Sequence, residues 1–256
     1  MTTYDSGAIS VLETRELTKE FAGFRAVDRV TIALDEGKVH ALVGPNGAGK
    51  TTLFHMLTGF VKPSAGSILA FGTEVTRLSP ERISRMGVAR SFQITSLFDH
   101  RTALQHVVLA LHVADPVSLR FWSSERAVDR YRDRANEILE EVGLAAVASR
   151  SAGSLPYGQK RALELALALA LEPKLLLLDE PTSGMGLEDV RRTIALIRHV
   201  RAGRTVLLVE HNMGVVAELA ERVIVMQQGR VIADGSYEQV RRDPSVITAY
   251  LGQTDA

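Results

Sequence analysis

The sequence predicts an α/β fold with a mostly parallel sheet, an antiparallel β part near the N-terminus and an inserted helical subdomain. Short apolar runs of strand length alternate with helical patterns, an order typical of a parallel sheet. Between residues 97 and 153, in contrast, apolar residues recur at helical spacing and no clear strand is found. We therefore expect a single domain, 1–256, with an α/β core at 1–96 and 166–256 and a helical subdomain at 97–165.

The first elements expected are two strands, residues 28–34 and 38–44, joined by an Asp-Glu-Gly turn. The second run is nearly all apolar, as expected for a strand covered on both faces. It leads into a glycine-rich segment and a helix at 51–57. Short strands with glycine turns follow at 66–75, and a helix is expected to start at Ser79-Pro80, because Pro suits a first turn.

The last third of the chain returns to alternating strands and helices. The expected elements are a strand within 175–181 (LLLLDEP), a helix near 187–200, a strand within 205–211 (TVLLVEH), a strand pair at 222–235 and a helix at 236–251 that breaks near Asp243-Pro244. Strands separated by helices favour a parallel arrangement in one sheet.

Composition and charge exclude several classes of protein. The 30 Lys and Arg residues balance 30 Asp and Glu residues, which argues against a general nucleic-acid-binding protein. The absence of cysteine excludes disulfides, zinc–thiolate sites and cysteine nucleophiles. The first residues lack a secretory signal pattern, and the most apolar run, 162–171, is interrupted by Glu164 and too short to span a bilayer. We expect a cytoplasmic protein that reaches a membrane only through partners.

The glycine-rich segment matches the phosphate-binding pattern G-x-x-x-x-G-K-[ST]. Its residues are Gly44, Pro45, Asn46, Gly47, Ala48, Gly49, Lys50 and Thr51. Glycines let several backbone N–H groups face one anion, and the helix N-terminus adds its dipole. Lys50 is expected to reach the β- and γ-phosphates of a nucleotide, the Thr51 hydroxyl to ligate Mg²⁺ and Thr52 to donate to a phosphate. The flanking strand and helix favour a P-loop NTPase core over an ordinary glycine-rich turn.

Two carboxylates end the predicted strand of residues 175–179. Asp179 and Glu180 lie at its C-terminal end, where open α/β sheets bind ligands. Because adjacent strand residues point to opposite sides, one carboxylate can serve a metal while the other faces a water. We assign Asp179 to Mg²⁺, through water, and Glu180 to polarising the attacking water. The alternative is a solvated acidic strand end without a role.

Three further segments give the chain a family resemblance. Gln93 lies in Ser-Phe-Gln near the start of the helical region, Leu-Pro-Tyr-Gly-Gln ends at Gln159, and His211 follows the strand VLLVE. In order and spacing, they resemble the Q-loop, signature and switch histidine of the ATP-binding subunits of ABC transporters, with Asp179 in the Walker B position. The resemblance covers nearly the whole chain. It is nearest to the ATPase subunits of branched-chain amino acid importers, whose ending resembles PSVITAYLG.

This resemblance implies roles for individual residues. Gln93 would contact Mg²⁺ or water and couple the nucleotide to a membrane partner. His211 would contact the γ-phosphate and orient the water together with Glu180. Phe21 matches the aromatic residue that stacks on adenine, Phe24 is a rival, and either ring could instead belong to the core.

The signature departs from the family's LSGGQ pattern. Pro156 replaces Ser and Tyr157 replaces the first Gly, so a serine hydroxyl is not available to a phosphate. The following helix should still begin here, with Ser154 as its N-cap. Tyr157, Gly158 and Gln159 are the signature residues expected at the nucleotide. The segment Thr182-Ser-Gly-Met-Gly186 ends in Gly where the family's D-loop has Asp, which leaves only main-chain contacts there.

The resemblance also implies an assembly. Two ATP molecules would lie in a head-to-tail dimer, each between one chain's phosphate loop and the other's signature, with a homodimer or heterodimer both open. Transmembrane permease subunits and, indirectly, a solute-binding protein would be partners in importing a small solute, with branched-chain amino acids expected. A non-transport ABC ATPase of DNA repair or translation would usually carry a coiled-coil insertion or tandem nucleotide domains. A non-catalytic regulator would be expected to lack Lys50, Glu180 or His211, and all three are present.

Overall fold

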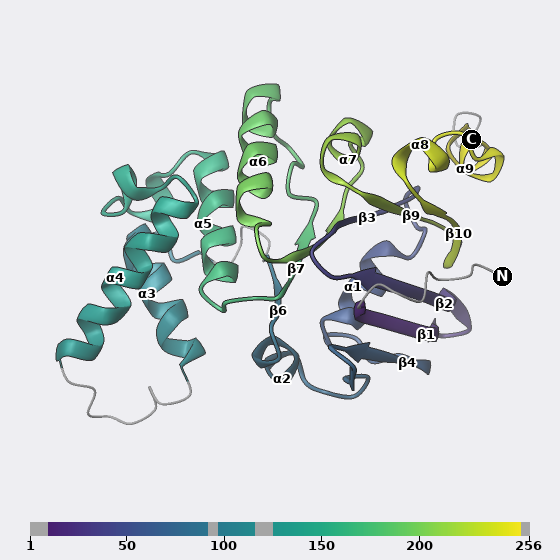
Figure 1. Ribbon diagram of the computed structural model, residues 1–256, viewed down its shortest axis with the longest axis horizontal. Helices are drawn as coiled ribbons and strands as arrows, with labels where there is room; N and C mark the ends of the chain where they lie inside the picture. Colours follow the sequence, from purple (N-terminus) through teal and green to yellow (C-terminus); the bar gives the residue numbers. More distant parts are fainter. Residues whose placement is uncertain (1–9, 92–96, 116–124, 252–256) are drawn as a thin grey trace.

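The computed structural model of the chain describes residues 10–91, 97–115 and 125–251. Two sheets and several helices form the structure, which confirms the predicted α/β class. In Figure 1 the helices α3 (Ala103–Ala114), α4 (Glu125–Glu141) and α5 (Tyr157–Leu169) gather at one end, and the smaller sheet lies toward the other. The larger sheet runs between them.

The larger sheet has six strands in the order β10-β9-β3-β8-β7-β6. Their bounds are β3 Val39–Val43, β6 Val88–Arg90, β7 Leu175–Asp179, β8 Thr205–Val209, β9 Arg222–Gln227 and β10 Arg230–Gly235. All neighbours are parallel except β9 and β10, which form an antiparallel pair. The strands predicted within 175–181, 205–211 and 222–235 are therefore confirmed.

Strand β7 shows how this sheet separates two hydrophobic clusters. Leu176 and Leu178 belong to the cluster that includes the helical region, whereas Leu175 and Leu177 belong to the cluster that includes α1 (Lys50–Leu57). All four leucines are buried because successive strand residues point to opposite faces and both faces are covered. The continuous apolar run in the sequence is thus explained by burial on both sides.

The smaller sheet is antiparallel, with the order β2-β1-β4-β5. Its strands are β1 Ser10–Phe21, β2 Phe24–Asp35, β4 Ala65–Ala70 and β5 Thr73–Glu74. It is the antiparallel part expected near the N-terminus. Strand β1 was not predicted, because several register shifts and the left-handed Glu16 (φ +48°) disrupt the two-residue alternation that identifies a strand.

Helices cover both sheets. The remaining ones are α2 Pro80–Arg85, α6 Leu187–Val200, α7 Met213–Leu219, α8 Tyr237–Val240 and α9 Pro244–Leu251. The start expected at Ser79-Pro80 and the break near Asp243-Pro244 are both found. Among the described residues, no helix has the length and apolar character needed to cross a membrane.

The helical region is organised around α3, α4 and α5. Helix α3 starts with a capping box in which Thr102 and Gln105 exchange side-chain-to-backbone hydrogen bonds. Helix α5 packs against α3 and α4 but also against α6 and β6 of the α/β part. The boundary expected between residues 165 and 166 falls inside α5, so one continuous helix belongs to both parts.

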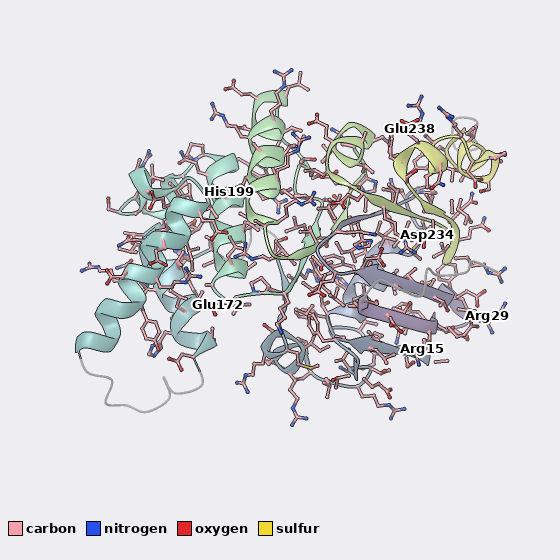
Figure 2. All side chains as sticks on the ribbon, in the orientation of Figure 1. Arg15, Arg29, Glu172, His199, Asp234 and Glu238 are labelled. Atoms are coloured by element: carbon pink, nitrogen blue, oxygen red, sulfur yellow. The ribbon has the colours of Figure 1, made fainter. Side chains whose placement is uncertain are left out.

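Charged side chains of both signs are distributed over the molecule (Figure 2). Among the labelled ones, Arg15 and Arg29 lie on strands of the smaller sheet, whereas Glu172 and Glu238 lie on other parts. This mixed distribution agrees with the formal net charge of zero.

Candidate nucleotide-binding site

The phosphate loop joins β3 to α1 and depends on glycine at defined positions. Gly44 and Gly49 have φ angles of +147° and +99°, which side-chain-bearing residues rarely adopt. A Cβ on Gly44 would lie 2.1 Å from the carbonyl oxygen of Met226, and one on Gly49 would lie 2.2 Å from that of Ala26. Neighbouring backbone therefore holds the loop tightly, and only glycine fits at both ends.

Lys50, the first residue of α1, turns back into this loop. Its ammonium donates to the carbonyl oxygens of Gly44 (2.6 Å) and Pro45 (3.0 Å). The side chain is buried, and this burial lowers the pKa of Lys50, while the negative charge of Glu180 acts in the opposite direction. The only positive group of the loop thus lies inside the curve of backbone, where a phosphate would be held.

Residues on the rim of the loop are accessible. Asn46, Gly47 and Thr51 are exposed, and Thr52 is half-buried in the first turn of α1. Thr51 is therefore accessible to an incoming ligand.

The register of the larger sheet brings the loop to the two carboxylates. Leu42 of β3 and Asp179 of β7 both pair with Val209 of β8. Because the three strands are parallel, the segments that follow them leave the sheet at one edge. Lys50, Glu180 and His211 belong to these segments, so the predicted site residues of three strands meet there.

Asp179 is held by a residue that sequence reasoning missed. Arg90, at the end of β6, donates from Nη2 to Oδ2 of Asp179 over 2.9 Å, and both side chains are mostly buried. The guanidinium also lies 4.8 Å from the ring centroid of Phe54. The only signal in the sequence was a basic residue just before the Ser-Phe-Gln segment, and nothing local pairs it with residue 179.

Glu180 and His211 are in direct contact. Nε2 of His211 donates to Oε1 of Glu180 over 2.6 Å, and both side chains are about two-fifths exposed. Glu180 adopts a left-handed conformation (φ +46°), and its N–H donates to the carbonyl of Val209. The sequence assigned these two residues to one step, and the structure places them within hydrogen-bond distance.

The signature segment differs from expectation at its start. Helix α5 begins at Tyr157 with Pro156 as N-cap, and no side chain caps it. Ser154 is not the N-cap: its hydroxyl donates to the carbonyl of Ser151 in a preceding short 3₁₀ turn. The Tyr157 hydroxyl donates to the carbonyl of Ser183, three residues beyond Glu180, over 3.0 Å. Tyr157 thereby ties α5 to the segment after the carboxylates.

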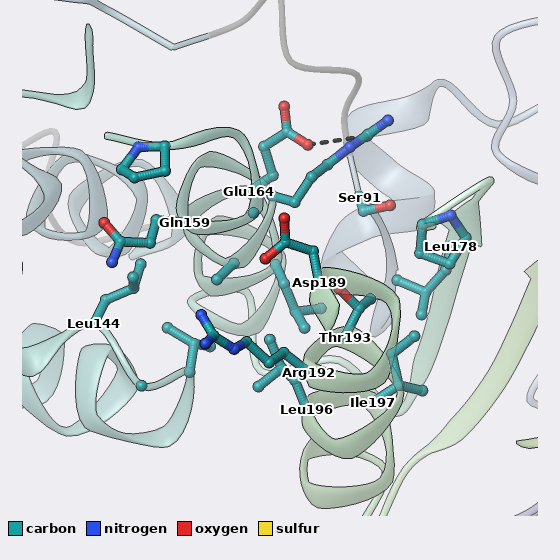
Figure 3. Close-up of a pocket in the computed structure, with 18 residues that line it drawn as sticks. Ser91, Leu144, Gln159, Glu164, Leu178, Asp189, Arg192, Thr193, Leu196 and Ile197 are labelled. Carbon is teal, nitrogen blue, oxygen red and sulfur yellow. Dashed lines mark hydrogen bonds and ion pairs between the residues drawn. The ribbon is translucent and has the colours of Figure 1, made fainter. Parts of the chain in front are cut away.

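Gln159 faces a cavity of about 340 Å³ between α5 and α6 (Figure 3). Its side-chain oxygen is buried there without a hydrogen-bond partner. In the same cavity, Glu164 forms an ion pair with Arg161, drawn as a dashed line. Burial raises the pKa of Glu164 to about 7, although the nearby guanidinium opposes this shift. In this conformation Gln159 lines the cavity instead of an open surface.

Phe21 and Phe24 pair across the hairpin of β1 and β2, and both rings are exposed. The core interpretation is therefore wrong for both, and either ring is accessible to a planar ligand. The ammonium of Lys19 lies 4.9 Å from the centroid of Phe21.

Gln93, assigned to Mg²⁺ or water, lies outside the described residues. Within those residues, no group of three or more His, Asp or Glu side chains could hold a metal ion.

A phosphate loop between a buried parallel strand and a helix, with carboxylates at the same sheet edge, defines a P-loop nucleotide-binding protein. The family model described as "ABC transporter" matches residues 27–183, and that described as "Branched-chain amino acid ATP-binding cassette transporter" matches 230–256. The chain therefore belongs to the ABC transporter family, in which it is an ATP-binding subunit and an ATPase. The resemblance seen in the sequence is confirmed.

Two relatives and one solved structure illustrate the match. The high-affinity branched-chain amino acid transport ATP-binding protein BraF of Pseudomonas aeruginosa is 41% identical over 253 residues, covering 95% of this chain and 98% of BraF. The corresponding protein LivG of Escherichia coli is 38% identical over 250 residues, with coverage of 95% and 98%. A crystal structure of an ABC transporter ATP-binding cassette in its ADP conformation has a TM-score of 0.84 at 30% identity, covering 95% of this chain and 99% of that one.

Proposed function

We propose that this ATPase uses Mg²⁺-bound ATP to power the import of branched-chain amino acids through separate membrane subunits. The observation that carries the catalytic part is the contact between Glu180 and His211 at the sheet edge where the phosphate loop also ends. It joins a carboxylate that can polarise water to an imidazole that can orient it.

The residues at this edge fit a magnesium nucleotide. The loop that Gly44 and Gly49 permit directs backbone toward one anion, and Lys50 supplies a buried positive charge. The Thr51 hydroxyl is an oxygen ligand of the kind that Mg²⁺ prefers, and the Asp179 carboxylate would hold the ion through water. When bound, Mg²⁺ would neutralise charge on the β- and γ-phosphates.

Each remaining residue has a role in this proposal. Glu180 accepts a proton from the attacking water or polarises it, and His211 holds the water and the γ-phosphate in line. Phe21 stacks on the adenine, Thr52 donates to a phosphate, and Gln93 senses the nucleotide for the membrane partner. The signature residues Tyr157, Gly158 and Gln159 contact the nucleotide of a second ATPase chain.

The proposed assembly lies at the cytoplasmic face of a membrane. A second ATPase chain, the same or different, completes the head-to-tail dimer, and transmembrane permease subunits receive its motion. A solute-binding protein contributes indirectly. The α/β core and the helical subdomain, divided near residues 96 and 165, would act as two lobes of each ATPase chain.

The solute assignment is supported by the relatives. BraF and LivG are both named for branched-chain amino acid transport, and each matches this chain over nearly its whole length. The second family model, which covers residues 230–256, carries the same description. The solute itself would contact the membrane and solute-binding subunits, so this chain contributes only the matching ATPase.

The test compares Mg²⁺-dependent ATP hydrolysis by the purified chain and by Glu180→Gln, with light scattering in ATP. We expect Glu180→Gln to lower kcat about 100-fold or more while ATP binding and ATP-dependent dimers persist. Glu188→Gln, a change at an exposed glutamate of α6, is the matched control and should leave kcat unchanged. If Glu180→Gln hydrolyses ATP at the wild-type rate, the proposed role of Glu180 is wrong.

The solute assignment has its own test. In vesicles that contain the membrane and solute-binding subunits, leucine should stimulate ATPase activity and lysine should not.

A further inference from the structure

Glu210 is a buried carboxylate directly before His211. Its residue is 3% exposed, and it follows Val209, the last residue of β8. In the part of the chain that the structure describes, no basic side chain forms an ion pair with it. A buried carboxylate without such a partner is costly unless hydrogen bonds satisfy both oxygens.

Four donors surround this carboxylate. Oε1 accepts from the N–H of Thr182 (3.1 Å) and from its hydroxyl (2.6 Å). Oε2 accepts from the N–H groups of His211 (3.1 Å) and Asn212 (3.3 Å). One side chain thus joins the segment that follows Glu180 to the segment that carries His211.

Both joined segments carry or adjoin a residue of the Glu180–His211 contact. Thr182 lies two residues after Glu180, and His211 is itself one of the residues held. Asn212 caps α7 by accepting from the N–H groups of Gly214 and Val215, so the far side of the His211 segment is also fixed. Glu210 therefore joins the two segments beyond the last backbone bond between them, that from the N–H of Glu180 to the carbonyl of Val209.

We propose that Glu210 is the positioning residue that sets the distance between the Glu180 carboxylate and the His211 imidazole. This inference rests on the catalytic roles proposed above for those two residues. Glu210 itself does not contact the reacting atoms, and it acts through His211.

The donor set explains why a carboxylate is required. A glutamine has one accepting oxygen and one NH₂ group that only donates. With its NH₂ toward His211 and Asn212, glutamine would face two backbone N–H donors; with its NH₂ toward Thr182 it would face one, because the Thr182 hydroxyl can turn and accept. Glutamine therefore keeps the shape of Glu210 but leaves at least one backbone N–H group opposite a donor in either orientation.

The decisive experiment is a double-mutant cycle of Glu210→Gln and His211→Ala. Single-turnover hydrolysis of radiolabelled ATP measures the rates, and nucleotide titration gives the binding stoichiometry and affinity. We expect Glu210→Gln to slow hydrolysis at least tenfold in the wild-type background and less than twofold with His211→Ala, because it acts through His211. ATP should still bind at one per chain with an affinity within about threefold of wild type. Equal fold losses in both backgrounds would overturn the inference.

A milder pair of variants keeps the test valid if Glu210→Gln fails to fold. Thr182→Val removes one of the four donors, and Thr182→Ser restores it. We expect Thr182→Val to slow hydrolysis about threefold and to move the imidazole ¹⁵N resonances of His211, with both effects absent in Thr182→Ser. Unchanged resonances in Thr182→Val would count against the inference. If His211→Ala and Glu180→Gln both hydrolyse ATP like wild type, the proposed catalytic roles fail instead, which is a separate result.

Discussion

In the phosphate loop, Lys50 bonds to carbonyl groups five and six residues before it. At the carboxylate edge, Asp179 bonds to a residue 89 positions away and Glu180 to one 31 positions away. The side-chain contacts of Lys50 are therefore local, although distant backbone packs against both ends of the loop, whereas the side-chain contacts of the carboxylate edge exist only because the strand order places β6, β7 and β8 side by side. The two halves of one site should respond differently to substitution, and the following variants test this difference.

The largest effect is expected for Gly49→Ala. The added Cβ would lie 2.2 Å from the carbonyl oxygen of Ala26 at a left-handed φ, so the loop or its neighbour must move. We expect a loss of about 4 kcal/mol in the free energy of unfolding, measured with urea on the ligand-free chain. Gly47→Ala is the control: its φ is also positive, but nothing lies within 4 Å, so strain alone should cost about 1 kcal/mol. Equal losses would show that steric contact does not hold the loop.

Arg90→Met tests the carboxylate edge. It leaves the mostly buried Asp179 without its partner, and we expect a loss of about 3 kcal/mol in the free energy of unfolding. Added Mg²⁺ and ADP should recover part of this loss, since the proposed metal supplies positive charge beside Asp179. Arg192→Met, which removes an exposed ion pair with Glu188, should cost less than about 0.5 kcal/mol. An Arg90→Met chain as stable as the control would mean that the edge does not depend on this contact.

The local and long-range halves also differ in how far the sequence predicts them. The phosphate loop could be located residue by residue, because its pattern is continuous and its glycines are needed for the backbone itself. Asp179, Glu180 and His211 could be placed at strand ends by the apolar runs before them. That they share one edge followed from the expected parallel order, not from their spacing.

Two arrangements that the sequence did not predict depend on contacts between distant segments. Arg90 and Asp179 meet only because β6 and β7 are neighbours in the sheet. No periodic pattern in the sequence predicts which strands are neighbours. The four donors around Glu210 come from two separate loops.

Ser154 was expected to cap α5 on propensity alone, but its hydroxyl bonds within a short turn instead. A local preference was here outweighed by local geometry that the sequence does not specify.

Glu164 combines a local contact with long-range burial, so it lies between the two cases. Its partner Arg161 is one turn away in α5. The pKa of Glu164, about 7, is nevertheless raised by burial beside α6. Because the folded chain binds this proton more tightly than the unfolded chain, the contribution is present at low pH and is lost as pH rises from about 4.5 through about 7.

The corresponding measurement is urea unfolding at pH 6 and pH 8 of wild type and Glu164→Gln. Wild type should lose roughly 1 kcal/mol more than Glu164→Gln between these two values. Glu188→Gln, with an exposed side chain, should keep the wild-type slope. If the free energies of unfolding of wild type and Glu164→Gln change equally with pH, burial does not raise the pKa of the Glu164 carboxyl.

Tyr157→Phe is expected to have the smallest effect on stability. The hydroxyl donates to the carbonyl of Ser183 at a partly exposed position, so its loss should cost about 0.5–1 kcal/mol in the ligand-free chain. This is a long-range contact, like those at the carboxylate edge, but it lies where solvent can replace it. Urea unfolding of both proteins measures the difference.

The same variant separates two roles for Tyr157. If the hydroxyl only ties α5 to the segment after Glu180, Tyr157→Phe should lower stability slightly and leave the ATP concentration for dimer formation unchanged. If the hydroxyl also contacts the nucleotide of a second chain, that concentration should rise about fivefold, while the stability of the ligand-free monomer changes no further. Light scattering at a series of ATP concentrations, beside the unfolding curves, distinguishes the two. A residue that stands where the family has glycine would then serve either its own chain or the neighbouring one.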